Sequence, residues 1–576
     1  MPVSRANHGD RPAQPAAACA SPAVPACPEG GRAGWGLDVL LAGMILLAGI
    51  KLVWHLDRCA DLDLTDESNF LNWGVHFFSH PNLPRPAWGG LLYWLWYWVL
   101  SLFTRDAVTL FYLNRSILTV LPAMLLYGAL RTAAVRRSGA ALFAFLFLIS
   151  QVNLPLVPKV NHLMVCLILL ALMLAPRLAS PPRRLGVYAL TALLCAYVHP
   201  EMYLAFLGLV AVLGGYAVRF RRTLDWRREG RWLGGGVLIA LALHVWLGRP
   251  MFGGEFRSFD AFSQHFALNW VAWTPGRLSP WNDCQAIVQR NFGPVHTISE
   301  ALRANPVMFK KHLAQNVKNY GVALTAMLYH LFWPRHLFIL TTRAGVILLE
   351  LVVFLYGMVL VRGGIRRGRI LAQLKKDPVT LIAYGCFLAP LVMASIVIYP
   401  RQHYLLPQAV LLTCLLIGLL TGGQVLTPRR HAALGCLGLA ALLLWVSPTA
   451  RRFVFEPQDH LRAVRQLRAL KLRGPANMLE NSGVYTAYLV GTFHNIPGLT
   501  KALPFYAFLR QADIGLVEDS PGIREDSRFR DDPEWHDFLK DYGAHGFDRV
   551  KINGTKIDFL VRRDLLPQAP TLGARR

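Results

Sequence analysis

Long apolar runs separated by short polar loops dominate this chain from residue 39 to residue 447. About 11 of these runs are typical of membrane helices. Several are shorter than the ~20 residues that a bilayer requires, so we expect their ends to extend into the flanking loops. The runs are 39–56, 109–130, 139–155, 162–176, 186–198, 202–218, 232–248, 344–361, 379–398, 405–424 and 431–447. The pattern predicts a polytopic α-helical membrane protein.

The aromatic segment 88–103 is not counted among the predicted membrane-crossing runs. It contains Trp94, Trp96 and Trp98 among leucines and tyrosines. Indole rings prefer the headgroup layer of a membrane, so this segment is typical of a helix that lies at the surface of the bilayer. We therefore expect juxtamembrane helices in the first outer loop, 57–108.

Arginine and lysine residues gather in alternate loops of the predicted membrane part, and this fixes the predicted orientation. These loops hold only Asp225, Glu229 and Asp377 as acids. They are 131–138, 177–185, 219–231, 362–378 and 425–430. Because basic loops stay in the cytoplasm, the amino terminus is predicted to be cytoplasmic and the remaining loops face outward.

The composition agrees with a membrane protein. Of the 576 residues, 54% are hydrophobic and only 16% are charged, which places the chain in the polytopic membrane class. The formal net charge of +26 comes from the short basic loops. We therefore attribute it to topology and expect no nucleic-acid partner.

The chain divides into three predicted parts. Residues 1–34 are rich in Ala, Pro and Gly and lack periodicity, which indicates a disordered cytoplasmic tail. Residues 35–447 form the membrane module, with a long outer loop at 249–343 in which 320–333 is expected to be an interfacial segment. Residues 448–576 are soluble in character and predict a small α/β domain on the periplasmic side.

Within the last part, the stretch 457–470 is typical of an amphipathic helix and 512–517 of a strand. Two more predicted strands, 547–552 and 556–561, flank Asn553-Gly554, a strong signal for a tight hairpin turn.

Ionisable residues gather in the predicted outer loops. They are Asp66, Glu67 and Arg85 in the first loop, Lys159 with Asn161 and His162, His199 with Glu201, and Arg401 with His403 and Tyr404. Such residues are costly at membrane depth unless they face a cavity and find partners, so we expect one shared cavity. Cations stabilise a departing phosphate and a carboxylate takes the proton of an incoming hydroxyl, which favours group transfer from a phosphate-activated lipid.

Structural alternatives exist for several of these residues. Thr65 or Asp66 is a candidate cap for a short helix through residues 70–78. Glu201 is a candidate cap for the next membrane helix after a tight turn, and Lys159 is a candidate for a side chain that snorkels from a helix end.

Three features together resemble a known superfamily. Thr65-Asp66-Glu67 follows the first membrane helix, with interfacial helices after it, and the late segment 401–407 reads Arg-Gln-His-Tyr-Leu-Leu-Pro, similar to an Arg-x-x-Tyr-Leu-Pro element. A soluble outer domain ends the chain. The layout of most of residues 36–447 resembles the GT-C superfamily of membrane glycosyltransferases, which includes protein O-mannosyltransferases and the aminoarabinose transferases that act on lipid A.

The resemblance implies an inverting sugar transfer from a polyprenyl-phosphate donor on the periplasmic face. Asp66 would be the base that deprotonates the acceptor hydroxyl, and Glu67 would shape the site or share the proton. The remaining residues would bind the phosphate or the sugar: Arg85, Lys159, His199, Glu201, Arg401, His403 and Tyr404.

The resemblance requires no cofactor. Where many members have a second outer acid after the third membrane helix, this chain has Lys159, Asn161 and His162, which weakens the case for a two-carboxylate metal site. His199 and Glu201 would ligate a divalent ion together with Asp66 if one is used, but no spacing demands a metal.

The expected location is the inner membrane of a bacterium, in contact with membrane lipids. The expected partners are a polyprenyl-phosphate sugar and an acceptor in an envelope glycan, a lipid or a protein. One alternative is a transporter or flippase of a lipid-linked saccharide, but the polar clusters gather at one face and the sequence has no convincing repeat. Another is a ligase that transfers a preformed oligosaccharide.

Overall fold

The computed structural model describes most of the chain. The described residues are 32–78, 89–251, 255–274, 276, 278–281, 283–332, 343–364, 374–421, 429–453, 457–473, 476–480, 485–489, 493–495, 503–524 and 529–567. Most of the predicted tail 1–34 therefore lies outside the described residues, and Arg85 lies outside them as well.

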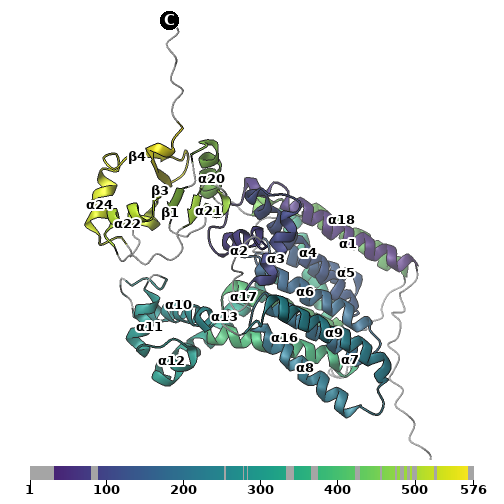
Figure 1. Cartoon of the computed structure of the whole chain (residues 1–576). Helices are drawn as coiled ribbons and strands as arrows, with labels where there is room; N and C mark the ends of the chain where they lie inside the picture. Colours follow the sequence, from purple (N-terminus) through teal and green to yellow (C-terminus); the bar gives the residue numbers. More distant parts are fainter. Residues whose placement is uncertain are drawn as a thin grey trace, which may run out of the picture.

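The molecule is a helical membrane protein with a small carboxyl-terminal sheet (Figure 1). Within the described part of the chain, 7 helices are long and apolar enough to cross a membrane. They are α1 (Arg32–Val53), α4 (Ala107–Thr132), α6 (Val160–Leu174), α8 (Met202–Arg219), α9 (Trp226–Leu247), α16 (Pro378–Val397) and α17 (Gln402–Thr421).

The other predicted membrane segments are helical as well. They form α5 (Arg137–Leu148), α7 (Pro181–Ala196), α14 (Arg343–Gly364) and α18 (Arg429–Val446). Each apolar run of the sequence is thus a helix. The helices α5 and α7 have only 12 and 16 residues, so a total of about 11 crossings stays a prediction.

The bundle has a buried centre and an apolar outer surface. Helix α4 packs against α1, α5 and α6, and most of its residues are buried. By contrast, α9 leaves Leu238 68% and Val245 87% exposed. A helix that is apolar on its exposed face is suited to contact with lipid rather than with water.

The predicted interfacial segment 320–333 is continuous with the residues before it. It forms the second half of α13 (Pro306–Phe332), which packs against α16, α17 and α5. Met327 and Leu331 are buried in the main core, and the Tyr320 hydroxyl donates to Gln408 Oε1 of α17 at 2.9 Å. The polar first half of α13 lowers its overall hydropathy, which is why the apolar end alone was visible as a short segment.

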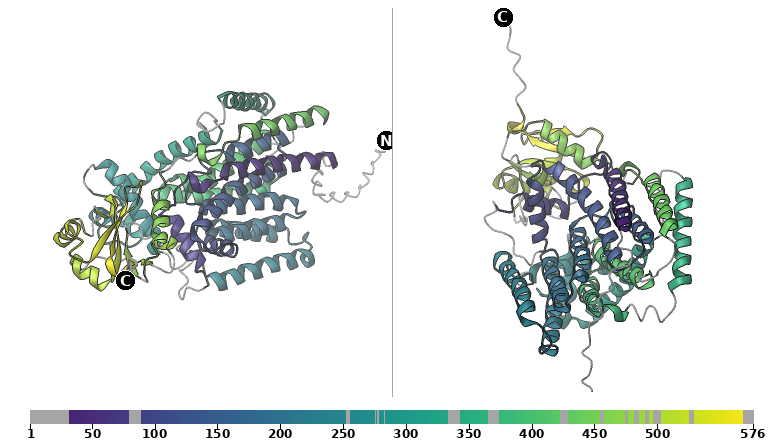
Figure 2. Two further views of the ribbon diagram at one scale, coloured as in Figure 1. Left: turned by 90° about the horizontal axis from the view of Figure 1, so that it is seen from above. Right: turned by 90° about the vertical axis from the view of Figure 1, so that its right-hand side faces the viewer.

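Two structures project from the same end of the bundle in both Figure 1 and Figure 2. The first is a group of helices from the second outer loop, α10 (Glu255–Trp273), α11 (Cys284–Phe292), α12 (Ile298–Ala304) and the start of α13. The second is the carboxyl-terminal domain. The short helices α2 (Asp66–Val75) and α3 (Leu91–Ser101) lie between the bundle and this domain. The aromatic segment of the first loop is therefore helical, as α3, and its position at the membrane surface stays a prediction.

The carboxyl-terminal domain is built on a five-stranded sheet of order β2-β1-β3-β5-β4. Its strands are β1 (Ala476–Leu479), β2 (Phe493–Asn495), β3 (Ile514–Asp519), β4 (Phe547–Lys551) and β5 (Asp558–Arg562). Strands β1, β2 and β3 are parallel, whereas β5 is antiparallel to both β3 and β4. The helices of this region are α19 (Ala450–Phe453), α20 (Asp459–Ala469), α21 (Tyr485–Tyr488), α22 (Phe505–Gln511), α23 (Pro521–Arg524) and α24 (Pro533–Lys540).

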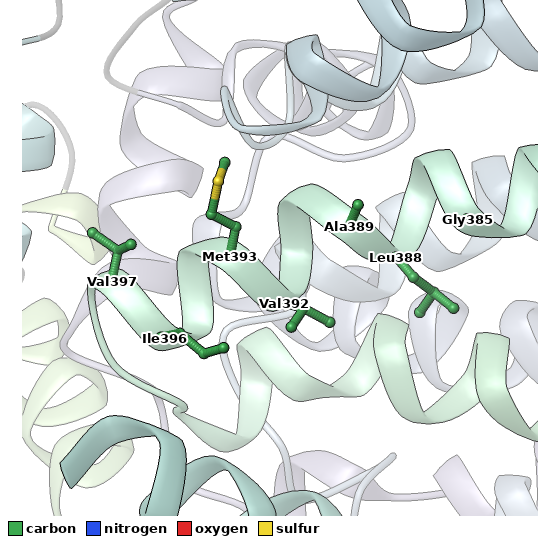
Figure 3. A pocket seen from close by; sticks show the side chains of 7 residues that line it. All are labelled: Gly385, Leu388, Ala389, Val392, Met393, Ile396 and Val397. Carbon is green, nitrogen blue, oxygen red and sulfur yellow. The ribbon is translucent and has the colours of Figure 1, made fainter. Parts of the chain in front are cut away.

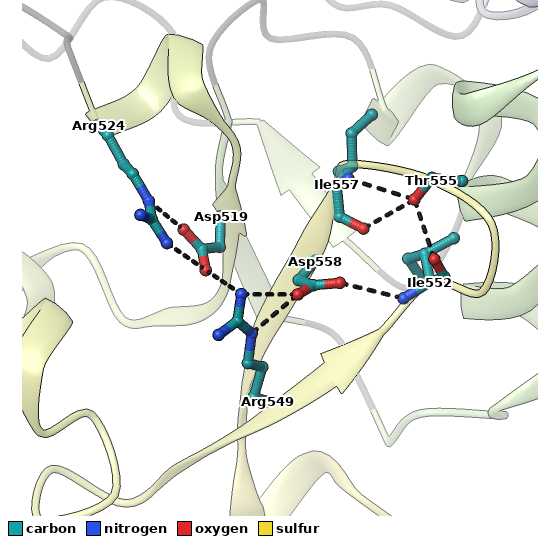
Figure 4. Close-up of polar contacts among 7 residues, drawn as sticks. All are labelled: Asp519, Arg524, Arg549, Ile552, Thr555, Ile557 and Asp558. Atoms are coloured by element: carbon teal, nitrogen blue, oxygen red, sulfur yellow. Dashed lines mark hydrogen bonds and ion pairs between the residues drawn. The ribbon is translucent and has the colours of Figure 1, made fainter. Parts of the chain in front are cut away.

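The predicted hairpin is present, but its turn is wider than two residues. Lys551 pairs with Asp558, so the loop covers 552–557. The Thr555 hydroxyl bonds with the carbonyls of Ile552 and Ile557 at 3.0 Å each. In the same region Arg549 joins Asp519 and Asp558, at 3.2 and 2.7 Å (Figure 4). Within this loop the Thr555 backbone N–H donates to the Ile552 carbonyl at 3.2 Å, so Asn553-Gly554 forms a tight turn that the side-chain bonds of Thr555 reinforce.

The domain is attached to the first outer loop through the start of α20. The Asp61 carboxylate accepts hydrogen bonds from the backbone N–H groups of His460 at 3.0 Å and Leu461 at 2.8 Å. An acid at a helix amino terminus is favoured by the free N–H groups and the helix dipole. The Tyr488 hydroxyl donates to the Asp63 carbonyl at 3.1 Å. The domain therefore rests directly on the segment that leads to Asp66.

Candidate functional site

The predicted site residues belong to loops at the end of the bundle that carries the carboxyl-terminal domain. Helix α1 ends there, α2 begins at Asp66, and the loop between α7 and α8 holds His199 and Glu201. The turn between α16 and α17 holds Arg401. Alternation of helix direction thus gathers residues that are more than 300 positions apart.

Asp63 caps α2, a role that the sequence analysis assigned to Thr65 or Asp66. Its carboxylate accepts from the backbone N–H of Thr65 at 2.9 Å and of Glu67 at 3.3 Å. The Thr65 hydroxyl donates to the same carboxylate at 2.5 Å and makes no cap bond itself. The first-turn donors of α2 are therefore served by Asp63, and the half-buried Asp66 carboxylate is left for another purpose.

Glu67 is turned into the protein. It is 1% exposed, and its carboxylate accepts from the Tyr93 hydroxyl at 2.5 Å and from the Tyr97 hydroxyl. It also accepts from Asn114 Nδ2 at 2.8 Å and from the Lys159 backbone N–H at 2.6 Å. Burial raises the pKa of Glu67, and the donated hydrogen bonds limit that rise. Glu67 thus joins α2 to α3, α4 and the start of α6.

Lys159 does not snorkel to a surface. Its side chain is completely buried, and its Nζ donates to the carbonyls of Asn153 at 2.5 Å and Leu154 at 3.3 Å. His162 Nε2 lies 3.3 Å from the same nitrogen. Burial lowers the pKa of Lys159 well below its ordinary value. The lysine closes the loop before α6 from inside, where a donor phosphate would have to displace packed side chains to reach it.

Tyr404 is the centre of the predicted residues that do meet. The carboxylates of Asp66 and Glu201 lie close enough to its hydroxyl to interact electrostatically. The guanidinium groups of Arg257 and Arg401 do so as well. Two carboxylates and two guanidinium groups from four separate segments therefore act electrostatically on one phenol.

Two histidines complete this group. The ring of His403 packs against Tyr404 with centroids 4.2 Å apart, and that of His199 packs edge-on at 5.9 Å. His199 Nδ1 lies 3.6 Å from Glu201 Oε1. Its buried Nε2 has no hydrogen-bond partner among the described residues. Burial lowers the pKa of His199 although Glu201 opposes this shift, so a neutral imidazole with a spare nitrogen faces the group.

The second outer loop supplies residues that the sequence analysis did not select. The Arg401 guanidinium lies over the ring of Trp281, 4.7 Å from its centroid. Tyr399 stacks on His265 with centroids 5.5 Å apart, and burial followed by the nearby Arg401 lowers the pKa of His265 to about 4. Arg257 comes from the same loop. The concentration of aromatic and basic residues in 249–343 was the only sequence signal for them.

Helix α13 fixes the turn that carries Arg401. Asn316 Nδ2 donates to the carbonyls of Ile396 at 2.9 Å and Ile398 at 3.0 Å. His312 Nε2 donates to the Val397 carbonyl at 3.2 Å, while its Nδ1 accepts from Asn269 of α10 at 3.0 Å. The last carbonyls of α16, which have no partner within their own helix, are thus bonded by buried side chains from the second outer loop.

An apolar groove leads to this turn along α16. Its volume is about 490 Å³, and its lining residues project from one stretch of the helix (Figure 3). They are Gly385, Leu388, Ala389, Val392, Met393, Ile396 and Val397. Val397, the last of these residues, lies four residues before Arg401.

The described residues offer no obvious metal centre. In the described ranges, no three side chains of the His, Cys, Asp and Glu types lie together in a way that would hold a metal ion. Arg85 lies outside the described residues, in the segment 79–88.

No protein-family model matches the sequence, and no curated protein gives a significant match.

Proposed function

We propose that this protein is an integral membrane glycosyltransferase that moves a sugar from a polyprenyl-phosphate donor to an acceptor hydroxyl at the outer face of an inner membrane. The observation that carries the proposal is the electrostatic interaction of Asp66, Glu201, Arg257 and Arg401 with Tyr404, at the turn that follows an open apolar pocket on α16. A lipid-linked phosphate needs a hydrocarbon path that ends at cations, and both are present at this end of the bundle.

In the proposed reaction Asp66 accepts the proton of the acceptor hydroxyl as its oxygen bonds to the anomeric carbon of the sugar. The bond from that carbon to the phosphate oxygen breaks, and polyprenyl phosphate leaves with the electron pair. Arg401 and Arg257 stabilise the charge that develops on the phosphate. A single displacement from the face opposite the phosphate inverts the configuration.

In this proposal the other predicted residues position the site or bind the donor. Glu67 and Lys159 position the loops that frame the site, because both side chains are buried and bonded within the protein. His199 and Tyr404 present polar atoms to the sugar or the phosphate. The charge balance at the phosphate is supplied by arginines, so the proposed reaction has no step that depends on a metal.

The test is a transfer assay in proteoliposomes with a panel of radiolabelled polyprenyl-monophosphate sugars and hydroxyl acceptors. We expect Asp66→Asn to lower turnover by about 10²- to 10⁴-fold while donor binding persists. Asp57→Asn is the matched control, because Asp57 belongs to the same loop, is 43% exposed and pairs with Arg465 at 3.6 Å. It should retain full activity.

Two outcomes would contradict the proposal. Wild-type turnover in the Asp66→Asn variant would remove Asp66 as the base. Movement of the intact lipid-linked sugar across the bilayer without transfer to any acceptor would instead support a transporter. Chemical quenching from outside the vesicles shows how much of a fluorescently labelled donor has crossed the bilayer intact. This measurement distinguishes a transporter from a transferase.

A further inference from the structure

A second cavity lies at the opposite end of the bundle. It has a volume of about 280 Å³ and lies among α4, α7, α16, α17 and the turn after α6. Its lining is Ala129, Thr132, Ala133, Ala134, Leu172, Pro176, Arg184, Lys376, Asp377, Thr380, Leu381, Tyr384, Cys414, Leu415, Gly418 and Leu419. It belongs to the predicted cytoplasmic end, where Arg131 and Arg137 pair with Asp38 at 2.9 and 3.1 Å.

The charged residues of this cavity differ in the number of hydrogen bonds and ion pairs that they form within the protein. Arg184 is fixed, since its Nε donates to the Leu178 carbonyl at 2.7 Å and its Nη1 reaches Asp377 Oδ2 at 3.4 Å. The Asp377 carboxylate also accepts from the Thr380 N–H at 3.2 Å and the Thr380 hydroxyl at 2.8 Å. Lys376 is exposed and makes no hydrogen bond or ion pair with any described residue. The rim therefore carries one cation in excess.

The rest of the lining is mainly hydrocarbon. Leu172, Leu381, Leu415 and Leu419 come from three different helices, α6, α16 and α17, and form an apolar wall below the charged rim. A free phosphate ion would gain nothing from such a wall. A phospholipid would gain from both parts, because its phosphate meets the cation while its chains cover the leucines. Basic pockets between membrane helices on the cytoplasmic side are known to suit anionic headgroups.

We propose that this cavity binds the headgroup of an anionic phospholipid. Lys376 forms the ion pair with the lipid phosphate, and Arg184 holds Asp377 away from it. The glycerol and upper acyl carbons lie against the leucines and Tyr384. The site is independent of the proposed sugar transfer, since no residue of the Tyr404 group lines it.

The test uses the full chain in a neutral detergent, titrated with phosphatidylglycerol or phosphatidylcholine and followed by native mass spectrometry. We expect the wild type to prefer phosphatidylglycerol and Lys376→Gln to weaken that binding about fivefold, the effect of one basic residue at a membrane surface. Lys375→Gln is the matched control. It removes the same charge from the neighbouring exposed residue, which does not line the cavity, and it should bind as the wild type does.

A second variant fills the cavity without touching a charge. A Cβ added at Gly418 would lie 3.5 Å from the Cβ of Ala133, an ordinary contact, so Gly418→Leu places its remaining carbons in the cavity. It should abolish the preference for phosphatidylglycerol and leave thermal unfolding in lipid-free detergent unchanged. Equal loss in Lys376→Gln and Lys375→Gln would overturn the proposal. So would stabilisation of the wild type by inorganic phosphate alone to the extent seen with the lipid.

Discussion

At the scale of single residues, the neighbouring acids Asp66 and Glu67 have opposite environments. Successive residues of a helix point about 100° apart, so at the start of α2 one side chain faces the Tyr404 group and the next faces the core. Glu67 Oε1 accepts from Tyr93, Tyr97 and Asn114, and Oε2 accepts from the Lys159 N–H. We infer that Glu67 stabilises the framework of the site and that Asp66 performs its chemistry.

This division predicts the effect of Glu67→Gln. A glutamine that keeps its oxygen toward Tyr93 and Tyr97 turns its NH₂ group toward the Lys159 N–H, so that two donors meet in a buried place. We expect a loss of about 1 to 3 kcal/mol of stability, measured by thermal unfolding in detergent. Tyr97→Phe removes one donor only and should cost less. A Glu67→Gln protein as stable as the wild type but without transfer activity would show that Glu67 acts chemically.

The roles of Asp63 and Lys159 show where sequence reasoning stops at this scale. Cap rules allowed Thr65 or Asp66 to serve α2, yet Asp63 lies before the helix in an extended segment and reaches the same N–H groups. Lys159 follows an apolar run, which is also the position of a snorkelling lysine. Only the fold of residues 150–159 shows that carbonyl groups surround its Nζ from inside. Both outcomes depend on loop geometry that no short pattern encodes.

At the scale of elements, the turn 398–401 is controlled by helices from another loop. Asn316 bonds to the carbonyls of Ile396 and Ile398 at the start of this turn, and Trp281 lies against Arg401. We expect Asn316→Ala to displace Arg401 and to raise the KM for the donor about fivefold or more, with a smaller change in kcat, because it removes a buried bond worth about 1 kcal/mol or more.

The neighbouring amide provides the control for this prediction. Asn319 lies one turn further along α13, and its bonds go to Gln315 and Asn269 rather than to the turn. Asn319→Ala should leave the KM for the donor nearly unchanged. Equal KM values in the two variants, at equal thermal stability, would show that α13 does not position Arg401.

Helices were predictable from the sequence to a much greater extent than their packing. Apolar runs of 13 or more residues have few alternatives in a membrane, and all of those identified are helices. The short strands β1 and β2, of 4 and 3 residues, gave no pattern to detect. Arg257, His265 and Trp281 could not be predicted as members of the site. They precede Arg401 by more than 100 residues in the sequence, and no local sequence pattern indicates which distant residues come together.

At the scale of the whole molecule, the segment 57–108 connects the end of the bundle that holds the Tyr404 group to the carboxyl-terminal domain. Asp61 binds the start of α20, Asp63 accepts from Tyr488 and caps α2, and Asp66 faces the Tyr404 group. A movement of the domain would therefore reach Asp66 through six residues of loop. The stability of this attachment therefore affects the position of Asp66.

A further attachment, between Asp106 and Arg468, makes a contribution to stability that depends on pH. Asp106 caps α4 by accepting from the Thr109 N–H at 2.8 Å, and it pairs with Arg468 of α20 at 2.7 Å. Partial burial acts to raise the pKa of Asp106, but the bonds from Thr109 and the pair with Arg468 outweigh it and hold the pKa below 3.8, its ordinary value. The unfolded chain therefore binds this proton at higher pH than the folded chain, so the contribution of Asp106 is complete above about pH 4 and is lost as the pH falls through the lower folded value.

We accordingly expect amide hydrogen exchange within residues 459–469 to accelerate as the pH is lowered below about 4, after correction for intrinsic exchange rates. Asp106→Asn retains a good helix cap but loses the charge, so its protection should be lower at pH 7 and depend less on pH. Asp57→Asn removes a carboxylate of similar exposure that faces Arg465 of the same helix at the longer distance of 3.6 Å, so we expect this pair to contribute less. Identical pH profiles for the two variants would show that the link between Asp106 and Arg468 does not hold the domain, and that Asp61 with the buried contacts around Tyr488 suffices.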